Sequence, residues 1–208
     1  MSEQHVLWYV ADPMCSWCWG FSPVISAIEE AYKNQLQISL ILGGLRPGTI
    51  DSVTERFRND ILRHWREVHE RTAQPFKFDG AMPDGFVYDT ELPSRAVVTI
   101  GEVDAATMLP YFKSVQRAFY AEGEDVTRPE ILATLAQRHN VDPEKFLADF
   151  HTEDMKQKTQ SHFFQAQQAG ITGFPTVVMQ GRGGIDLLTA GYQPFENLQP
   201  KIEAWLAE

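Results

Sequence analysis

The two ends of the sequence carry β-strand patterns while the middle carries helical ones, and this order restricts the folds that the chain can adopt. The run His5–Ala11 is apolar and rich in β-branched and aromatic residues, which predicts a buried strand. Apolar residues then recur at helical spacing over 16–34 and at every second position over 37–42, which predicts a helix and a second strand. A strand–helix–strand unit of this length favours parallel strands joined by a right-handed crossover.

The middle of the chain is predicted to be helical. Three helix starts are marked by a capping residue or by a proline in the first turn: the capping box Ser52-x-x-Glu55, the segment Thr127-x-x-Glu130 with Pro129, and Asp142-Pro143. An apolar stripe from Met108 to Phe119 predicts another helix, with Pro110 in its first turn or at a kink. Residues 74–89 are rich in proline and glycine and are predicted to form a loop.

A long helix and a second β pattern complete the chain. Residues 152–169 have helical spacing, and the apolar runs 176–179 and 185–190 flank a glycine-rich turn, which predicts a β-hairpin. Apolar spacing over 198–206 predicts a closing helix, with Pro200 in its first turn or at a bend. The order of elements is therefore β-α-β, a helical block, one long helix, and β-β-α.

This order predicts an α/β domain formed by residues 1–44 and 150–208, interrupted by an α-helical insertion domain at 45–149. The chain has 208 residues, which suits one domain with a large insertion. Its 18 Lys and Arg against 28 Asp and Glu give a net charge of −10. This balance argues against a nucleic-acid binder or a binder of anionic membranes, because both require a positive field.

The sequence carries no membrane or export signal that we can recognise. It has no run near the roughly 18 apolar residues that span a bilayer. Its first basic residue is Lys33, whereas a secretory signal opens with positive charge. We therefore expect a protein that begins near Met1 and stays in the cytoplasm, where thiols are held reduced.

The segment Cys15-Ser16-Trp17-Cys18 lies between the first predicted strand and the first predicted helix. Unpaired backbone N–H groups and the helix dipole favour a thiolate at a helix N-terminus. A spacing of three residues places Cys18 one turn further along on nearly the same helix face. The pair is predicted to be redox-active, with Cys15 as the exposed nucleophile and Cys18 as the resolving thiol.

Three other interpretations compete with a redox pair. A structural disulfide here would close a very small loop and so would remove little entropy from the unfolded chain. A zinc site lacks ligands, because the sequence has only two cysteines and His64 and His69 are five residues apart. Two ordinary buried cysteines are the third alternative. We expect neither a metal nor an organic cofactor.

Two groups near the cysteines each have a structural and a functional interpretation. Asp12, three residues before Cys15, could cap the helix or satisfy loop N–H groups, or it could relay a proton to or from Cys18. Trp17 and Trp19 could form an apolar rim that contacts unfolded substrate. Alternatively, Trp19 belongs to the core and only Trp17 is exposed.

The segment Gly173-Phe174-Pro175-Thr176 precedes the hairpin, where a proline is allowed because it heads a strand. Together with Asp12–Gly20 and the helical insertion, it resembles the thioredoxin-fold DsbA family, in particular its signal-less, FrnE-like cytosolic branch of predicted disulfide oxidoreductases or isomerases. The resemblance covers nearly the whole chain. It implies a thioredoxin-like fold with a large α-helical insertion, a cis Pro175 beside the cysteines, and a Phe174 backbone that pairs with an extended substrate segment.

The chain departs from the strongly oxidising members of that family in one place. Its intervening dipeptide is Ser16-Trp17 instead of the Pro-His of those members, so no imidazolium is available there to stabilise the thiolate. We therefore expect a less oxidising couple.

The function that we expect is thiol–disulfide exchange through the Cys-Ser-Trp-Cys dithiol, as a protein-disulfide reductase or isomerase. The expected partners are protein or small-molecule disulfides and thiols, with glutathione as a candidate. One alternative is a kappa-class-like glutathione-dependent transferase or isomerase, although such relatives generally carry serine where this chain has Cys15. The other is a non-catalytic redox-sensing protein whose dithiol switches an interaction surface.

Overall fold

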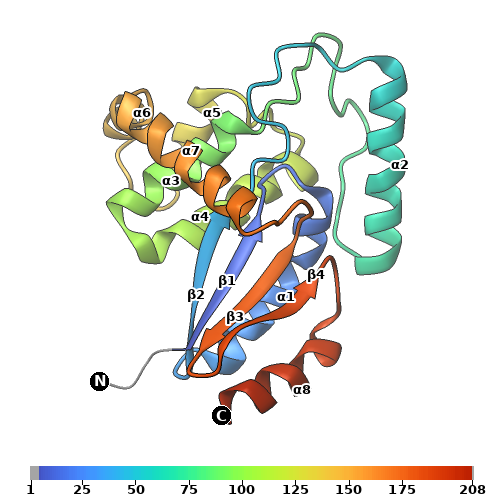
Figure 1. Cartoon of the computed structure of the whole chain (residues 1–208). Helices are drawn as coiled ribbons and strands as arrows, with labels where there is room; N and C mark the ends of the chain where they lie inside the picture. Colours follow the sequence, from blue (N-terminus) through green and yellow to red (C-terminus); the bar gives the residue numbers. More distant parts are fainter. Residues whose placement is uncertain (1–4, 208) are drawn as a thin grey trace.

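Residues 5–207 are described by the computed structural model, and over this range the central element is a four-stranded mixed sheet with the order β2-β1-β3-β4 (Figure 1). Strand β1 (His5–Ala11) pairs in parallel with β2 (Leu36–Leu42) and antiparallel with β3 (Thr176–Gly181). Strand β4 (Gly184–Ala190) pairs antiparallel with β3 at the sheet edge. The predicted parallel unit and the predicted hairpin are both confirmed, and strands from the two ends of the chain form one sheet.

Helix α1 (Ser16–Tyr32) connects β1 to β2 and lies behind the sheet in the view of Figure 1. Helix α8 (Phe195–Leu206) follows β4 and contacts both β4 and α1. Helix α7 (Glu153–Gln168) contacts β2 and leads back into the sheet through the loop before β3. The predicted α/β thioredoxin-like fold is thus observed, with the first and last segments of the chain around one sheet.

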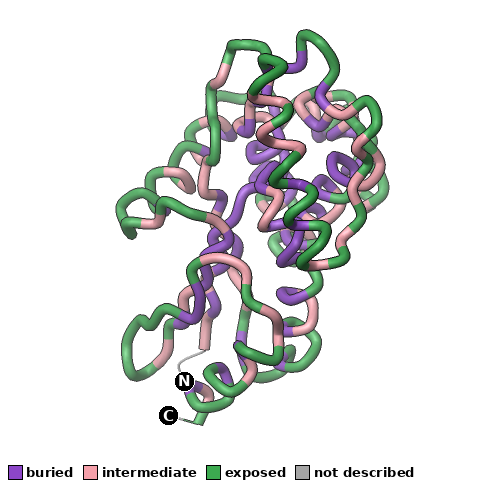
Figure 2. The backbone as a smooth tube through the Cα atoms, turned by 90° about the vertical axis from the view of Figure 1, so that its right-hand side faces the viewer, coloured by how far each residue is buried: buried purple, intermediate pink, exposed green. Residues whose placement is uncertain are grey.

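The chain between β2 and α7 is helical, as predicted. Its helices are α2 (Glu55–Thr72), α3 (Glu91–Val103), α4 (Ala105–Arg117), the π-helical turn η1 (Ala118–Glu122), α5 (Pro129–Gln137) and α6 (Pro143–Phe150). Buried side chains of these helices and of the sheet form one continuous hydrophobic cluster, and Figure 2 shows the buried backbone concentrated where the two meet. The predicted boundaries of the insertion domain, at residues 45 and 149, stay a prediction.

The start of α2 differs from the prediction. The N-cap is Thr54, whose hydroxyl accepts a hydrogen bond from the Phe57 N–H at 3.2 Å. Ser52, expected to be the cap, instead forms an antiparallel bridge with Val87. This extended pairing holds the chain outside helical geometry for two more residues, so the capping-box pattern was misleading. Asp142 and Thr152 do cap α6 and α7 with their side chains, which confirms those two starts.

Helix α3 was not predicted. Its residues 93–100 are all buried, including the polar Ser94, Arg95 and Thr99, so burial along it does not follow the alternation of apolar and polar side chains. Pro110 and Pro200 lie in the second turns of α4 and α8, not in the first. The cap of α5 is Arg128 instead of Thr127, whose hydroxyl donates to the Asp125 side chain.

Helices α1 and α2 approach each other closely at Gly20. A Cβ at this position would lie 2.8 Å from Val68 Cγ1 and 3.0 Å from Thr72 Cγ2, so only glycine allows this packing. Trp65 and Val68 are the buried residues of α2, and much of the rest of this helix is exposed. Within residues 5–207, no helix has both the length and the apolar character that crossing a bilayer requires.

Candidate active site

The two cysteines lie where β1 gives way to α1. Cys15 is the N-cap of α1, and Cys18 belongs to its first turn. Both are free thiols. The Cys15 N–H donates to the Asp12 carbonyl at 3.1 Å, and the Cys15 carbonyl accepts from the Trp19 N–H at 3.1 Å. These backbone bonds fix both side chains relative to the end of the strand.

Cys15 is less accessible than the sequence suggested. It is 7% exposed, while Cys18 is 0% exposed. The cause is the loop before β3, because the Cys15 thiol donates to the Phe174 carbonyl at 3.6 Å. The Phe174–Pro175 peptide bond in this loop is cis. The fold therefore brings Cys15, Phe174 and Pro175 together although about 160 residues separate them in sequence.

The ring of Phe174 rests on the end of β2. A Cβ on Gly43 would lie 2.1 Å from Phe174 Cε1 and 2.2 Å from Cζ. The Gly43 N–H donates to the Ala11 carbonyl at 2.8 Å, so this stretch of backbone is held by the sheet and cannot easily yield. Gly43, which directly follows β2, therefore provides the space that the Phe174 ring occupies.

Cys18 lies beneath Cys15 and away from solvent. Burial raises the pKa of the Cys18 thiol above its usual value, and the neighbouring Cys15 sulfur raises it further. Cys18 therefore stays protonated in the dithiol form, and Cys15 is the sulfur at the surface of the site.

Asp12 is 0% exposed and connects two loops. Its Oδ1 accepts from the Met14 N–H at 2.8 Å, and its Oδ2 accepts from the Leu45 N–H at 2.7 Å. Of the two interpretations of Asp12, the structure shows the satisfaction of loop N–H groups. Burial raises the pKa of the Asp12 carboxyl to about 6, so the group can exchange a proton near neutral pH.

The two tryptophans have different environments, in agreement with the alternative in which Trp19 belongs to the core. Trp19 is buried, its indole N–H donates to the Pro75 carbonyl at 3.0 Å, and its ring stacks on Tyr120. Trp17 is half-buried and lines a cleft beside Cys15. Only Trp17 is placed to contact a substrate.

The cleft at Cys15 has a volume of about 420 Å³ and runs between the start of α1, the loop after β2, and α2. Its walls include Trp17, Arg46, Phe57 and His64. The Arg46 guanidinium lies over the Phe57 ring, 4.5 Å from its centroid. Among the described residues that line this cleft none is acidic, so it is locally positive in a chain of net charge −10.

Arg46 was not identified as a site residue from the sequence. The available signal was topological. Arg46 follows β2, Cys15 follows β1, and the carboxyl ends of parallel strands meet at one edge of a sheet.

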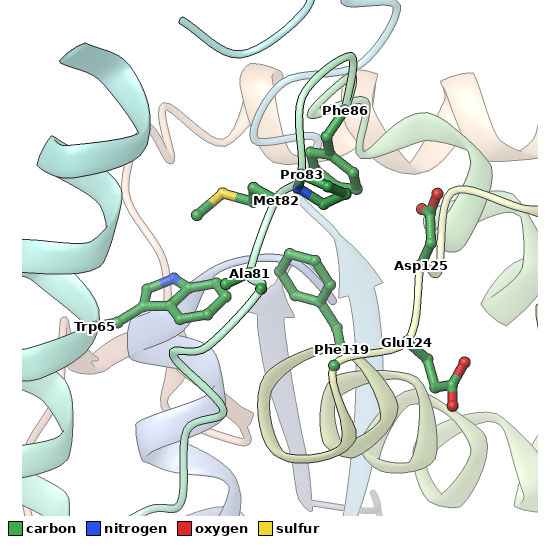
Figure 3. A pocket seen from close by; sticks show the side chains of 10 residues that line it. Trp65, Ala81, Met82, Pro83, Phe86, Phe119, Glu124 and Asp125 are labelled. Atoms are coloured by element: carbon green, nitrogen blue, oxygen red, sulfur yellow. The ribbon is translucent and has the colours of Figure 1, made fainter. Parts of the chain in front are cut away.

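A second pocket, of about 130 Å³, lies on another side of Trp65 (Figure 3). Met82, Phe86 and Phe119 supply apolar walls, and Glu124 and Asp125 lie near its rim. Neither cysteine lines this pocket. In the described part of the chain, no group of three or more His, Cys, Asp or Glu side chains is arranged to hold a metal ion.

Comparison with solved structures gives the class of the protein. A provisionally assigned protein disulfide isomerase from Nitrosomonas europaea is 41% identical, with a TM-score of 0.92 over 99% of this chain and 98% of that one. The cytosolic disulfide reductase DsbM from Pseudomonas aeruginosa is 26% identical, with a TM-score of 0.81 over 97% and 98% of the two chains. The chain therefore falls in the class of thioredoxin-fold proteins to which these two proteins, both named for activity on disulfides, belong.

The family follows from the sequence match. Residues 6–203 match the DSBA-like thioredoxin domain, and the chain belongs to this family. The ClpXP adapter protein SpxH from Halalkalibacterium halodurans is 22% identical over 173 residues, which cover 80% of this chain. The aligned part is 56% of that relative's length, so the chain spans about half of it.

The packing of the Phe174 ring against Gly43 can be tested with the variant Gly43→Ala. The added Cβ must displace the Phe174 ring and with it the carbonyl that contacts Cys15. We expect the rate of disulfide exchange to fall about 10- to 100-fold, because a displacement of about 1 Å can have this effect. Gly173→Ala on the same loop is the control, since its Cβ would meet nothing within 4 Å. Equal rates in the two variants would contradict the assignment.

The buried Asp12 carboxyl predicts a pH dependence of stability. The Asp12 carboxyl has a pKa of about 6 in the folded protein against an ordinary value of 3.8, so the folded state binds the proton more tightly. The contribution of this proton to the free energy of unfolding is therefore complete below pH 4. It is lost as the pH rises through 6, and the loss is about 3 kcal/mol at most. We expect Asp12→Asn to gain stability relative to the wild type between pH 4 and pH 7 in urea unfolding. Parallel stability curves for the two proteins would show that Asp12 ionises without penalty.

Proposed function

We propose that the protein is a cytoplasmic disulfide reductase or isomerase that works through Cys15 and Cys18. The observation that supports the proposal is the difference in accessibility between the two sulfurs. Cys15 borders the cleft and touches the Phe174 carbonyl, while Cys18 is fully buried below it. A thiol at the surface with a second thiol beneath it is the arrangement needed for attack followed by release.

In the first step the Cys15 thiolate attacks a substrate disulfide. One substrate sulfur leaves as a thiolate, and the other stays bonded to Cys15 as a mixed disulfide. Cys18 then loses its proton and attacks the Cys15 sulfur. The second substrate sulfur leaves with the electron pair, so the substrate disulfide is reduced and the Cys15–Cys18 pair is oxidised. Two equivalents of an external thiol return the pair to the dithiol.

The neighbouring groups have distinct parts in this proposal. The backbone of Phe174, at the head of β3, can pair with an extended substrate segment beside Pro175. Trp17 offers an apolar contact at the rim of the cleft. Asp12, with its pKa of about 6, can take the Cys18 proton, and the structural bonds to Met14 and Leu45 hold it in place for that.

The positive cleft supports an anionic small thiol as the reductant or as a substrate. Arg46 and His64 line the cleft with Cys15, and glutathione carries two carboxylates. DsbM from P. aeruginosa, 26% identical over 98% of this chain, was also solved with GSH. We propose that Arg46 binds a glutathione carboxylate during the exchange.

The comparisons also favour one non-catalytic alternative, a protein that binds a partner according to the state of its dithiol. The relative named ClpXP adapter protein SpxH aligns with 80% of this chain at 22% identity. Repeated turnover of disulfides distinguishes the two functions, because an adapter would exchange each disulfide once and stop.

Variants of the two cysteines test the catalytic proposal. We expect Cys15→Ser to lose more than about 99% of the activity in an insulin-reduction assay with a thiol reductant, since the nucleophile is absent. Cys18→Ser keeps the nucleophile but lacks the resolving thiol, so it should accumulate a mixed disulfide that a non-reducing gel detects. Full turnover by Cys15→Ser would exclude the mechanism.

Substitution of Arg46 tests the glutathione assignment. Arg46→Met keeps the apolar stem that packs on Phe57 and removes the charge. We expect the KM for glutathione disulfide to rise about tenfold or more, because hydrogen bonds to charged groups contribute about 1.5–3 kcal/mol. The KM for uncharged hydroxyethyl disulfide should not change. Arg63→Met is the control, because Arg63 is an exposed α2 residue paired with Asp60. An equal change in KM for both disulfides would mean that Arg46 does not recognise the glutathione carboxylate.

A further inference from the structure

The hydroxyl of Tyr9 is fully buried, and within the described residues it makes no hydrogen bond of ordinary geometry, although the Cys18 thiol lies within its reach. A buried hydroxyl without a partner costs about 1–3 kcal/mol. Native proteins carry few such groups, and one that persists calls for a physical explanation. Tyr9 lies in the middle of β1, the strand that leads directly to the cysteine motif.

The aromatic neighbours of Tyr9 place its side chain beside the helix that carries Cys18. The Tyr9 ring packs against Phe21 of α1, with 5.8 Å between ring centroids, and against Phe112 of α4 at 6.0 Å. Phe21 is one helical turn after Cys18 and shares its face of α1. Tyr9 is therefore enclosed on the side of β1 that α1 covers, below the buried sulfur.

The ionisable groups around Cys18 come from three segments. Tyr9 lies on β1, Asp12 in the loop after β1, and Cys15 at the start of α1. Burial raises the pKa of the Tyr9 hydroxyl well above its usual value, and the charges of Cys18 and Cys15 raise it further. Tyr9 thus keeps its proton at any working pH, so it can donate a hydrogen bond but cannot act as a base.

We propose that Tyr9 is a positioning residue for the resolving step, in which its hydroxyl donates a hydrogen bond to the Cys18 sulfur as that sulfur becomes a thiolate. This inference rests on the proposed function. Hydrogen bonds to an ionised acceptor are roughly twice as strong as neutral ones. The contact between the Tyr9 hydroxyl and Cys18 is weak while Cys18 is a neutral thiol and strengthens when Cys18 ionises, so it stabilises the reactive thiolate.

The proton and electron balance of the step is unchanged by Tyr9. The Cys18 proton leaves to Asp12 or to water, and the Cys18 electron pair forms the bond to the Cys15 sulfur. The substrate sulfur departs with the pair from the broken mixed disulfide. Tyr9 keeps its own proton throughout and only lowers the free energy of the buried anion.

The direct test is Tyr9→Phe in a Cys15→Ser background, where Cys18 is titrated through its thiolate absorbance. The substitution removes only a hydroxyl that has no other partner, so the fold should be kept. We expect the thiolate fraction of Cys18 at a given pH to fall about tenfold, in line with one hydrogen bond to a charged group. Tyr32→Phe is the control, because its hydroxyl on α1 also makes no hydrogen bond of ordinary geometry but lies at the far end of the helix, near Glu203 and away from the cysteines.

A kinetic test uses the intact dithiol. In single-turnover experiments, Tyr9→Phe should slow release of the mixed disulfide about tenfold and leave the alkylation rate of Cys15 unchanged. An unchanged Cys18 titration in Tyr9→Phe, or an equal effect of Tyr32→Phe, would overturn the inference. Failure of the proposed function has a different signature: the wild type would then form no mixed disulfide at Cys15, whatever the titration of Cys18 shows.

Discussion

The pairing of β1 with strands from both ends of the chain is the constraint on which the site depends. Val10 pairs with Thr176 and Ala11 pairs with Leu42. The segment after β1, the segment after β2 and the segment before β3 must therefore meet at one edge of the sheet. These three segments carry Cys15, Arg46 and Phe174. The hydrogen-bonded register of the strands is sufficient to bring these three segments together, and no side-chain contact is needed for it.

Burial then gives each group at this edge a different chemical character. Cys15 borders a cleft with cationic walls, whereas Cys18 lies below it without access to water. Asp12 is buried as well, but two backbone N–H groups partly offset the cost of its charge. Burial therefore opposes the ionisation of Asp12 and, more strongly, that of Cys18 and Tyr9.

Features encoded in short stretches of sequence were predictable. The bounds of β1, the helix that follows the cysteines, the hairpin and the caps of α6 and α7 each follow from local periodicity or from capping chemistry. Features that depend on distant contacts were not. Helix α3 is covered on all sides, Ser52 is held by Val87, and Cys15 is shielded by a loop that lies about 160 residues away. Gly43 could be recognised as a strand end, but its role needs the position of Phe174.

The contact between α1 and α2 at Gly20 has a consequence for the size of substrate. Helix α2 forms one wall of the cleft, and it is anchored through Trp65 and Val68. A larger side chain at Gly20 would act as a wedge between the two helices, since Val68 already fills the space where a Cβ would go. The width of the cleft therefore depends on a glycine that does not line it, and a larger side chain there would push α2 away from α1 without altering any residue that a substrate meets.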